Sequence, residues 1–151
     1  MKVRLTRSLS LILVIVLLFT VAVGCQKQSG SKGQATPYKI GFMAAITGGA
    51  SFLGAPERDA AVMIQKQLEA QGGTITGPDG VKHPIQILIH DTEGKGDVAI
   101  SVAKKLINDE KVVAIVGTTT SPVSVALIPV VQEAKVPMVS MASSSAIVEP
   151  V

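Results

Sequence analysis

The sequence is poor in the residue types that support redox, metal and base-stacking chemistry. Its 151 residues include one cysteine, no tryptophan, one tyrosine, three phenylalanines and two histidines. A single cysteine excludes an internal disulfide and any metal site built from a cluster of cysteines. His83 and His90 have no metal-ligand spacing to another histidine or cysteine. So few aromatic rings also leave little with which to stack nucleic-acid bases.

A surplus of positive charge is also lacking outside the N-terminus. The formal net charge is +3, but three of the 14 Lys and Arg lie in the first seven residues. The remaining 11 basic residues balance the 11 Asp and Glu, all of which lie downstream. This balance gives no case for nucleic-acid binding, so we expect no nucleic-acid partner.

The N-terminus is typical of an export signal. Lys2, Arg4 and Arg7 precede the apolar run Leu9–Val23. That run of about 15 residues is shorter than the ~20 that a membrane-spanning helix needs. The sequence therefore predicts a signal peptide over residues 1–24.

The end of this run, Val21-Ala22-Val23-Gly24-Cys25, resembles a bacterial lipoprotein signal. Ala22 stands where that family favours leucine. The resemblance implies cleavage after Gly24 and attachment of lipid to Cys25, which anchors the protein to a membrane. The alternative is that Cys25 belongs to an ordinary secretory signal.

The rest of the sequence divides into a tether and a folded lobe. Residues 25–37 are rich in Gln, Ser, Gly and Lys, which predicts a flexible tether. From residue 38 to 151, apolar runs of strand length alternate with patterns of helical period. Strands are expected at Tyr38–Ala45, Ile85–His90, Val112–Val116 and Val136–Met141. Helices are expected at 55–70, 97–108 and 122–134, and Gly77-Pro78-Asp79-Gly80 predicts a turn in a small excursion such as a hairpin.

This order of elements predicts an α/β fold with a parallel sheet and helices on both faces. Pro56 is expected to open the first helix, and Asp97 is expected to cap the second. The helical spacing predicts four apolar residues on the buried face of the first helix: Ala60, Ala61, Ile64 and Leu68.

Four hydroxyl side chains follow the third predicted strand. Gly117 ends that strand, Thr118-Thr119-Thr120-Ser121 follow, and Pro122 suits the first turn of a helix. A helix N-terminus offers free N–H groups and a partial positive charge, which suit a carboxylate. The alternative is that Ser121 only caps the helix and the threonines only decorate a turn.

The loops that follow the predicted strands converge at one edge of a parallel sheet, where such folds bind ligands. These loops are Ile46–Gly54, Asp91–Gly96, Gly117–Ser121 and Ala142–Ser145. Three of the four are rich in glycine and hydroxyl groups and are nearly uncharged. This composition predicts binding through neutral hydrogen bonds rather than acid–base catalysis.

The motifs of nucleotide-dependent enzymes do not fit. Gly48, Gly49 and Gly54 have the wrong spacing for a dinucleotide fingerprint, and Ala55-Pro56 stand where a phosphate loop needs Lys and Ser or Thr. Asp91 is expected to order its own loop. We therefore expect no cofactor, no metal and no enzymatic activity.

Two segments carry a family resemblance: IGFMAAITGGASFLGAPERDAAVMI, and the run from Asp91 to Ser145, DTEGKGDVAISVAKKLINDEKVVAIVGTTTSPVSVALIPVVQEAKVPMVSMASSS. They resemble the branched-chain amino acid (Leu/Ile/Val) substrate-binding proteins of ABC transporters, which are type I periplasmic binding proteins. The resemblance implies two α/β lobes that close over a small ligand. The chain is much shorter than that family, so it is expected to be a fragment that holds an incomplete first lobe.

The resemblance also implies which residues bind the ligand. It assigns the ligand's carboxylate and ammonium to the hydroxyl of Ser121, the backbone carbonyl of Ala142 and the hydroxyl of Ser144. Thr120 and Ser143 are neighbouring candidates. Leu53 falls where many members place an aromatic ring against the ligand.

The function so implied is that of an extracytoplasmic, lipid-anchored solute-binding protein. It would deliver branched-chain or related amino acids to an ABC permease, with an amino acid or amide as ligand and the membrane reached through lipid. The alternative is a ligand-sensing lobe for amides or small carboxylates that feeds a signalling partner. An extracytoplasmic enzyme is disfavoured, because no loop carries a catalytic set of residues.

Overall fold

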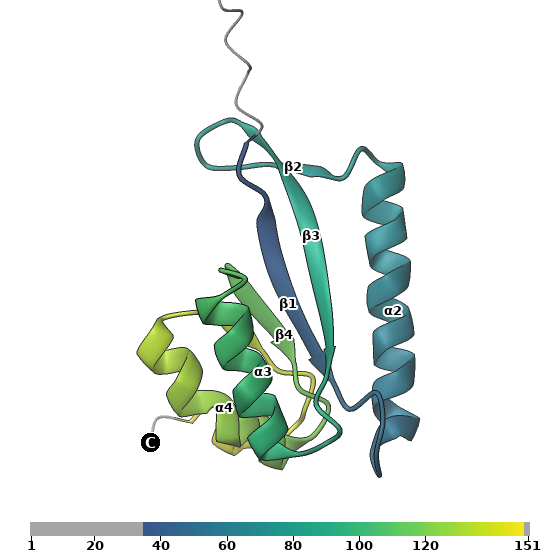
Figure 1. Cartoon of the computed structure of the whole chain (residues 1–151), viewed down its shortest axis with the longest axis vertical. Helices are drawn as coiled ribbons and strands as arrows, with labels where there is room; N and C mark the ends of the chain where they lie inside the picture. Colours follow the sequence, from purple (N-terminus) through teal and green to yellow (C-terminus); the bar gives the residue numbers. More distant parts are fainter. Residues whose placement is uncertain (1–34, 150–151) are drawn as a thin grey trace, which may run out of the picture. The chain divides into compact units, whose positions relative to one another are not determined.

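A computed structural model describes residues 35–149. The expected signal peptide, the lipidation site Cys25 and the tether up to residue 34 lie outside the described residues. The elements follow one another as β1 (Tyr38–Ala44), α2 (Ser51–Ala70), β2 (Thr74–Thr76), β3 (Lys82–Asp91), α3 (Gly96–Asn108), β4 (Ala114–Gly117), α4 (Ser121–Ala134), β5 (Met138–Val139) and the short 3-10 helix η1 (Ser145–Ile147) (Figure 1).

The sheet has the strand order β2-β3-β1-β4-β5. β1 pairs in parallel with β3 on one side and with β4 on the other, and β4 pairs in parallel with β5. The chain thus passes from β1 to β3 and then crosses to β4, so the strand order reverses between β1 and β4. Ligands of open α/β sheets bind beyond the carboxyl ends of the strands at such a point.

Helices cover both faces of the sheet, as predicted. Figure 1 shows α2 on one side of the strands and α3 with α4 on the other. Side chains of successive residues in a strand point to opposite faces. Accordingly Phe42 packs with Ala61 of α2, whereas Met43 packs with residues of α3 and α4.

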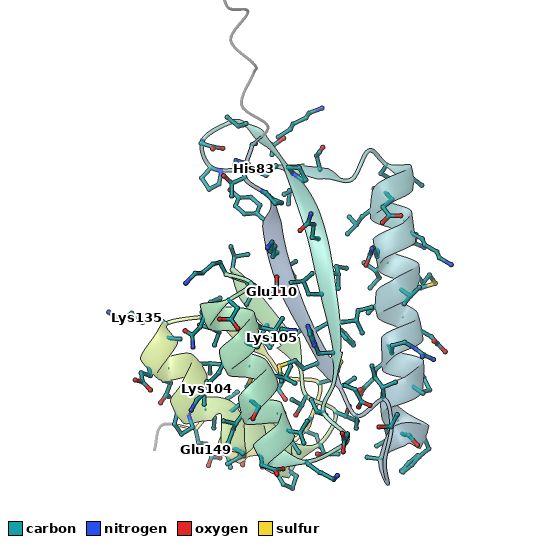
Figure 2. The ribbon with its side chains drawn as sticks, viewed as in Figure 1. His83, Lys104, Lys105, Glu110, Lys135 and Glu149 are labelled. Carbon is teal, nitrogen blue, oxygen red and sulfur yellow. The ribbon has the colours of Figure 1, made fainter. Side chains whose placement is uncertain are left out.

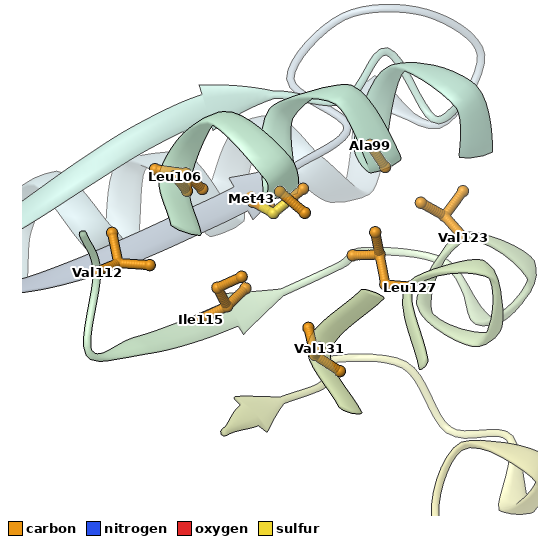
Figure 3. Packing of buried hydrophobic residues seen from close by; sticks show 9 residues of the cluster. Met43, Ala99, Leu106, Val112, Ile115, Val123, Leu127 and Val131 are labelled. Atoms are coloured by element: carbon orange, nitrogen blue, oxygen red, sulfur yellow. The ribbon is translucent and has the colours of Figure 1, made fainter. Parts of the chain in front are cut away.

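The α3–α4 side holds the larger core (Figure 3). Met43, Leu106, Ile115 and Leu127 are fully buried there. The cluster on the α2 side has three buried residues: Phe42, Ala44 and Ala61. Burial of an aliphatic side chain of this size contributes about 1.5–3 kcal/mol, so the α3–α4 side contributes more to stability.

The predicted excursion is a hairpin in which β2 pairs antiparallel with the start of β3. His83 lies at this hairpin, at the end of the sheet where β1 begins (Figure 2). Its Nδ1 lies 2.8 Å from the Thr36 carbonyl oxygen and its Nε2 lies 2.9 Å from Asp79 Oδ2. Its ring stacks on Tyr38 with centroids 4.4 Å apart. His83 thus joins the segment before β1 to the hairpin.

Helix α2 begins earlier than predicted, at Ser51 rather than at Ala55-Pro56. A Cβ on Gly54 would overlap the Ala45 carbonyl, so only glycine lets the first turn lie against the end of β1. Pro56 lies inside the helix, where it cannot bond the carbonyl of Phe52. Phe52 is 74% exposed, so water can reach that end of the turn.

Three other expectations are corrected. Only Ala61 of the predicted face of α2 is buried, while Leu68 is half-buried and Ala60 and Ile64 are exposed, because among residues 35–149 no second helix covers this face of the sheet. Asp97 lies within the first turn of α3 rather than at its N-cap, which is Lys95. The last predicted strand shortens to the two residues of β5.

Candidate ligand-binding site

The loops that follow β1, β4 and β5 meet at the carboxyl edge of the sheet. Met43 and Gly117 are partners in the register of β1 and β4. Gly117 has a φ of +136°, and a Cβ there would overlap the Met43 carbonyl oxygen. Glycine is therefore required at this close approach, which sets the loops after β1 and β4 side by side.

Asp91 bonds Glu93 in its own loop, as expected, but most of its hydrogen bonds go to the loop after β1. Its Oδ1 accepts hydrogen bonds from the backbone N–H groups of Ile46, Thr47 and Glu93, at 2.9, 3.2 and 2.8 Å. The Thr47 hydroxyl donates to Oδ2. Burial opposes ionisation of Asp91, but these hydrogen bonds outweigh it and lower the pKa of the carboxyl group.

Thr118 belongs to a network of hydroxyl groups that joins two loops and is buried at Thr118 and Ser124. Its Oγ1 lies 3.0 Å from Ser124 Oγ, which lies 2.8 Å from Ser140 Oγ. Ser140 Oγ also accepts a hydrogen bond from the Ala142 N–H at 3.0 Å. The network therefore fixes the loop after β5 relative to the start of α4.

Thr119 is also occupied by partners within the protein. Its Oγ1 accepts a hydrogen bond from the Ala45 N–H at 2.8 Å and donates one to Glu57 Oε2 at 2.6 Å. Thr118 and Thr119 are both buried. The alternative that the threonines only decorate a turn is therefore wrong for these two residues.

Thr120 and Ser121 differ from the two threonines before them. Thr120 is the N-cap of α4 and makes no side-chain capping bond, and Ser121 is the first helical residue. The alternative that Ser121 caps the helix is therefore wrong. Both residues are half-buried, and within residues 35–149 neither hydroxyl has a hydrogen-bond partner. They are the hydroxyl groups of this loop that a ligand can use.

Ala142, Ser143 and Ser144 lie in the loop after β5. Ser143 is exposed, and Ala142 and Ser144 are half-buried. All three line a groove of about 920 Å³ that follows β5, the later turns of α4 and η1. Thr120 and Ser121 do not line it. The groove runs beside β5, the last strand of the sheet, and not at the start of α4. We therefore place the candidate site where the loops after β1, β4 and β5 meet.

Leu53 lies in the first turn of α2 and is 46% exposed. The adjacent Phe52 is more exposed. The structure thus brings the α2 start, the α4 start and the loop after β5 to one edge of the sheet. The roles that the resemblance implies for Leu53, Ser121 and Ser144 stay predictions.

Glu57, Ser124 and Ser140 organise this edge, although their sequence positions do not single them out as such. Ser140 lies within the predicted apolar strand Val136–Met141, and Ser124 follows the hydroxyl run by three residues. The sequence signal for Ser124 and Ser140 is a hydroxyl residue within an apolar strand or near the start of a helix. Such a residue indicates a hydrogen-bond partner, because a buried hydroxyl group needs one.

In the part of the chain from 35 to 149, no three His, Cys, Asp or Glu side chains gather where they could hold a metal ion. The helices described there are also too short or too polar to cross a membrane. The chemistry that this edge offers is hydrogen bonding from hydroxyl and backbone groups. The start of α4 adds the partial positive charge of a helix N-terminus.

A family model described as "Periplasmic binding protein" matches residues 37–150. Of the curated proteins compared with the chain, none matches it.

Solved structures give further matches. The substrate-binding protein LivJ of the branched-chain amino acid transporter from Streptococcus pneumoniae, in complex with isoleucine, is 28% identical and covers 74% of this chain, with a TM-score of 0.65. The leucine-binding protein LivK from Thermotoga maritima is 30% identical and covers 72%, with a TM-score of 0.61. An ABC transporter solute-binding protein from Rhodopseudomonas palustris, in complex with 3,4-dihydroxybenzoic acid, is 28% identical and covers 74%, with a TM-score of 0.63.

The chain spans under a third of the length of these solved structures. The matches cover 31% of the Streptococcus protein, 28% of the Thermotoga protein and 29% of the Rhodopseudomonas protein.

Proposed function

The chain belongs to the periplasmic binding protein family, and we propose that it supplies one wall of an amino-acid-binding site that serves an ABC transporter. The single observation that carries this proposal is the pair of half-buried hydroxyl groups of Thr120 and Ser121 at the start of α4, which have no hydrogen-bond partner among residues 35–149. They lie on a sheet edge where the strand order reverses.

The ligand class is a small carboxylate, in the first place a branched-chain amino acid. A carboxylate suits the free N–H groups and hydroxyls of a helix start. The ligands named for two matched structures, isoleucine and 3,4-dihydroxybenzoic acid, both carry a carboxyl group. In this proposal Ser121 bonds the carboxylate, and Ala142 and Ser144 bond the ammonium group.

The proposal extends to the place of the protein in the cell. Residues 1–24 would be a lipoprotein signal, and Cys25 would carry lipid at the outer side of the membrane. Residues 25–37 would be a tether, and residues from 38 on would belong to the first lobe of the binding domain. An ABC permease would receive the ligand.

The experiment is a calorimetric titration of the full chain with L-isoleucine, L-leucine, L-valine and 3,4-dihydroxybenzoate. We expect Ser121→Ala to weaken binding of the preferred ligand by about 10-fold, the effect of losing one hydrogen bond to a charged group. Ser101→Ala, on the exposed side of α3, is the matched control and should leave affinity unchanged.

Two results would contradict the proposal. One is that none of the four compounds binds to the full chain. The other is that Ser121→Ala binds its ligand as tightly as the unaltered protein does.

A further inference from the structure

A single buried oxygen links three elements at the candidate site. Thr119 Oγ1 accepts the Ala45 N–H at the end of β1 and donates to Glu57 Oε2 on α2. Thr119 itself lies in the loop between β4 and α4 and is 7% exposed. Glu57 and Thr119 are separated by 62 positions in the sequence.

The proton of the Thr119 hydroxyl group is already donated to a partner within the protein. A threonine hydroxyl has one proton to donate and two lone pairs that accept. The proton is donated to Glu57 Oε2 at 2.6 Å, and one lone pair accepts the Ala45 N–H. A hydrogen bond to a carboxylate is stronger than one between neutral groups. Thr119 therefore has no proton left to donate to a ligand, and its role is to hold other groups in position.

Glu57 has no competing ion pair among residues 35–149. The ion pairs found there join Lys39 to Glu110, Arg58 to Asp59, His83 to Asp79, and Lys95 to Glu93. Although Arg58 is adjacent in sequence, its guanidinium group contacts Asp59. The Glu57 carboxylate is thus directed to Thr119 alone among these side chains.

The spacing on each element connects this bond to the candidate ligand contacts. Glu57 follows Leu53 by four residues in α2, so the two share one face of the helix. Thr119 directly precedes Thr120 and Ser121 in the chain. A bond from the second turn of α2, at Glu57, to Thr119 therefore sets the start of α2 relative to the start of α4.

We propose that Glu57 and Thr119 are positioning residues that hold the start of α2, with Leu53, at a fixed distance from the start of α4, with Ser121. The ligand-binding part of this inference rests on the proposed function. Neither residue contacts the ligand in this proposal. The bond fixes the width of the site, because it joins the starts of two helices that follow different loops.

The first experiment measures this distance without a ligand. Spin labels on Phe52→Cys and Val125→Cys, in the full chain with Cys25→Ser, report the separation of the N-terminal ends of α2 and α4 by pulsed electron paramagnetic resonance. We expect Thr119→Val and Glu57→Leu to broaden the distance distribution. Thr119→Ser and Glu57→Gln keep the required donor or acceptor and should preserve it. Glu69→Leu, at the far end of α2, is the matched control.

The second experiment titrates the unlabelled variants with L-isoleucine. We expect Glu57→Leu and Thr119→Val to weaken binding by about 10-fold, because the two helix starts must then be ordered when the ligand binds. Glu57→Gln and Thr119→Ser should restore the affinity of the unaltered chain. If the two residues only stabilised the fold, variants that remain folded by circular dichroism would keep their affinity for isoleucine. An affinity loss in folded Glu57→Leu and Thr119→Val, restored in Glu57→Gln and Thr119→Ser, therefore indicates positioning.

The outcomes are separable. An unchanged distance distribution in both Thr119→Val and Glu57→Leu would overturn the positioning role. A broadened distribution with unchanged isoleucine affinity would overturn its importance for binding. If the unaltered chain does not bind isoleucine, the proposed function fails for that ligand, and the distance measurement still decides whether the two residues position the helices.

Discussion

His83 shows how one side chain can make stability depend on pH. Two acceptors, the Thr36 carbonyl and the Asp79 carboxylate, face its two ring nitrogens. Only the protonated imidazole has an N–H on both nitrogens. The Thr36 carbonyl and then the Asp79 carboxylate raise the pKa of His83, against a smaller opposing effect of burial. Protonated His83 therefore joins the segment before β1 to the hairpin.

The prediction concerns His83→Gln, which removes the titrating ring. Because the pKa of His83 is raised on folding, its stabilisation is present below the unfolded value of about 6.5 and is lost as pH rises through the folded value. The urea midpoint of the unaltered chain should exceed that of the variant by more at about pH 5.5 than at about pH 8.5.

His90 serves as an internal control for this measurement. Burial, and next the charge of Lys105, lower the pKa of His90, so its effect on stability has the opposite sign. It is present in both proteins and cancels in their difference. An NMR titration should also place the pKa of His83 above that of His90. The opposite order, or a midpoint difference that does not vary with pH, would refute the prediction.

At this scale, the sequence identifies the hydroxyl-rich loop but cannot divide its members by role. Thr118 bonds Ser124, and Thr119 bonds Glu57. These partners are set by tertiary packing, which a local pattern does not report. Within the described residues, the hydroxyl groups of Thr120 and Ser121 have no hydrogen-bond partner. Tertiary packing decides this too, so only the folded structure distinguishes their roles from those of Thr118 and Thr119.

The elements of secondary structure show where local patterns are sufficient. Helix α3 ends at Asn108 as predicted, because its buried residues Ala99, Ala103 and Leu106 recur at helical spacing. Helix α2 departs from its pattern because Gly54 and the carbonyl of Ala45 fix its first turn. The early start depends on contact with β1, and the sequence around Pro56 favours a later one.

A pair of glycine substitutions tests the docking of α2. Gly54→Ala adds a Cβ that overlaps the Ala45 carbonyl, so α2 must shift. We expect the free energy of unfolding to fall by about 1–3 kcal/mol, as for other overpacked sites. Gly49→Ala is the control, because nothing lies within 4 Å of its added Cβ. Urea denaturation measures both, and an equal effect of the two substitutions would contradict the close contact.

At the scale of the whole molecule, the alternation of strands and helices predicts the α/β architecture correctly. Parallel strands joined through helices have one favoured handedness, which leaves few topologies to choose from. The pattern does not predict how many side chains are buried on each face of the sheet. The α2 face has few buried residues, and Met63 and Ile64 are about half exposed.

Membrane attachment is a property of the whole chain and can be tested directly. When the chain is expressed in a bacterium fed with labelled palmitate, we expect label on the protein and recovery in the membrane fraction. Cys25→Ala should abolish the label and release the protein, because Cys25 is the residue that would carry the anchoring acyl chains. Ser29→Ala, in the same segment, should change neither result. Palmitate incorporation that persists in Cys25→Ala would refute the lipid anchor.

The outer edge of strand β3 affects the tendency of the protein to aggregate. The strand runs for ten residues, but β2 pairs only with Lys82–Pro84. From Gln86 on, no strand lies beside its outer edge within residues 35–149. Unpaired N–H and C=O groups along an edge can template the addition of a foreign strand. Gln86 and His90 limit the uninterrupted apolar run of this strand to the three residues Ile87–Ile89, and shorter apolar runs are less prone to aggregate.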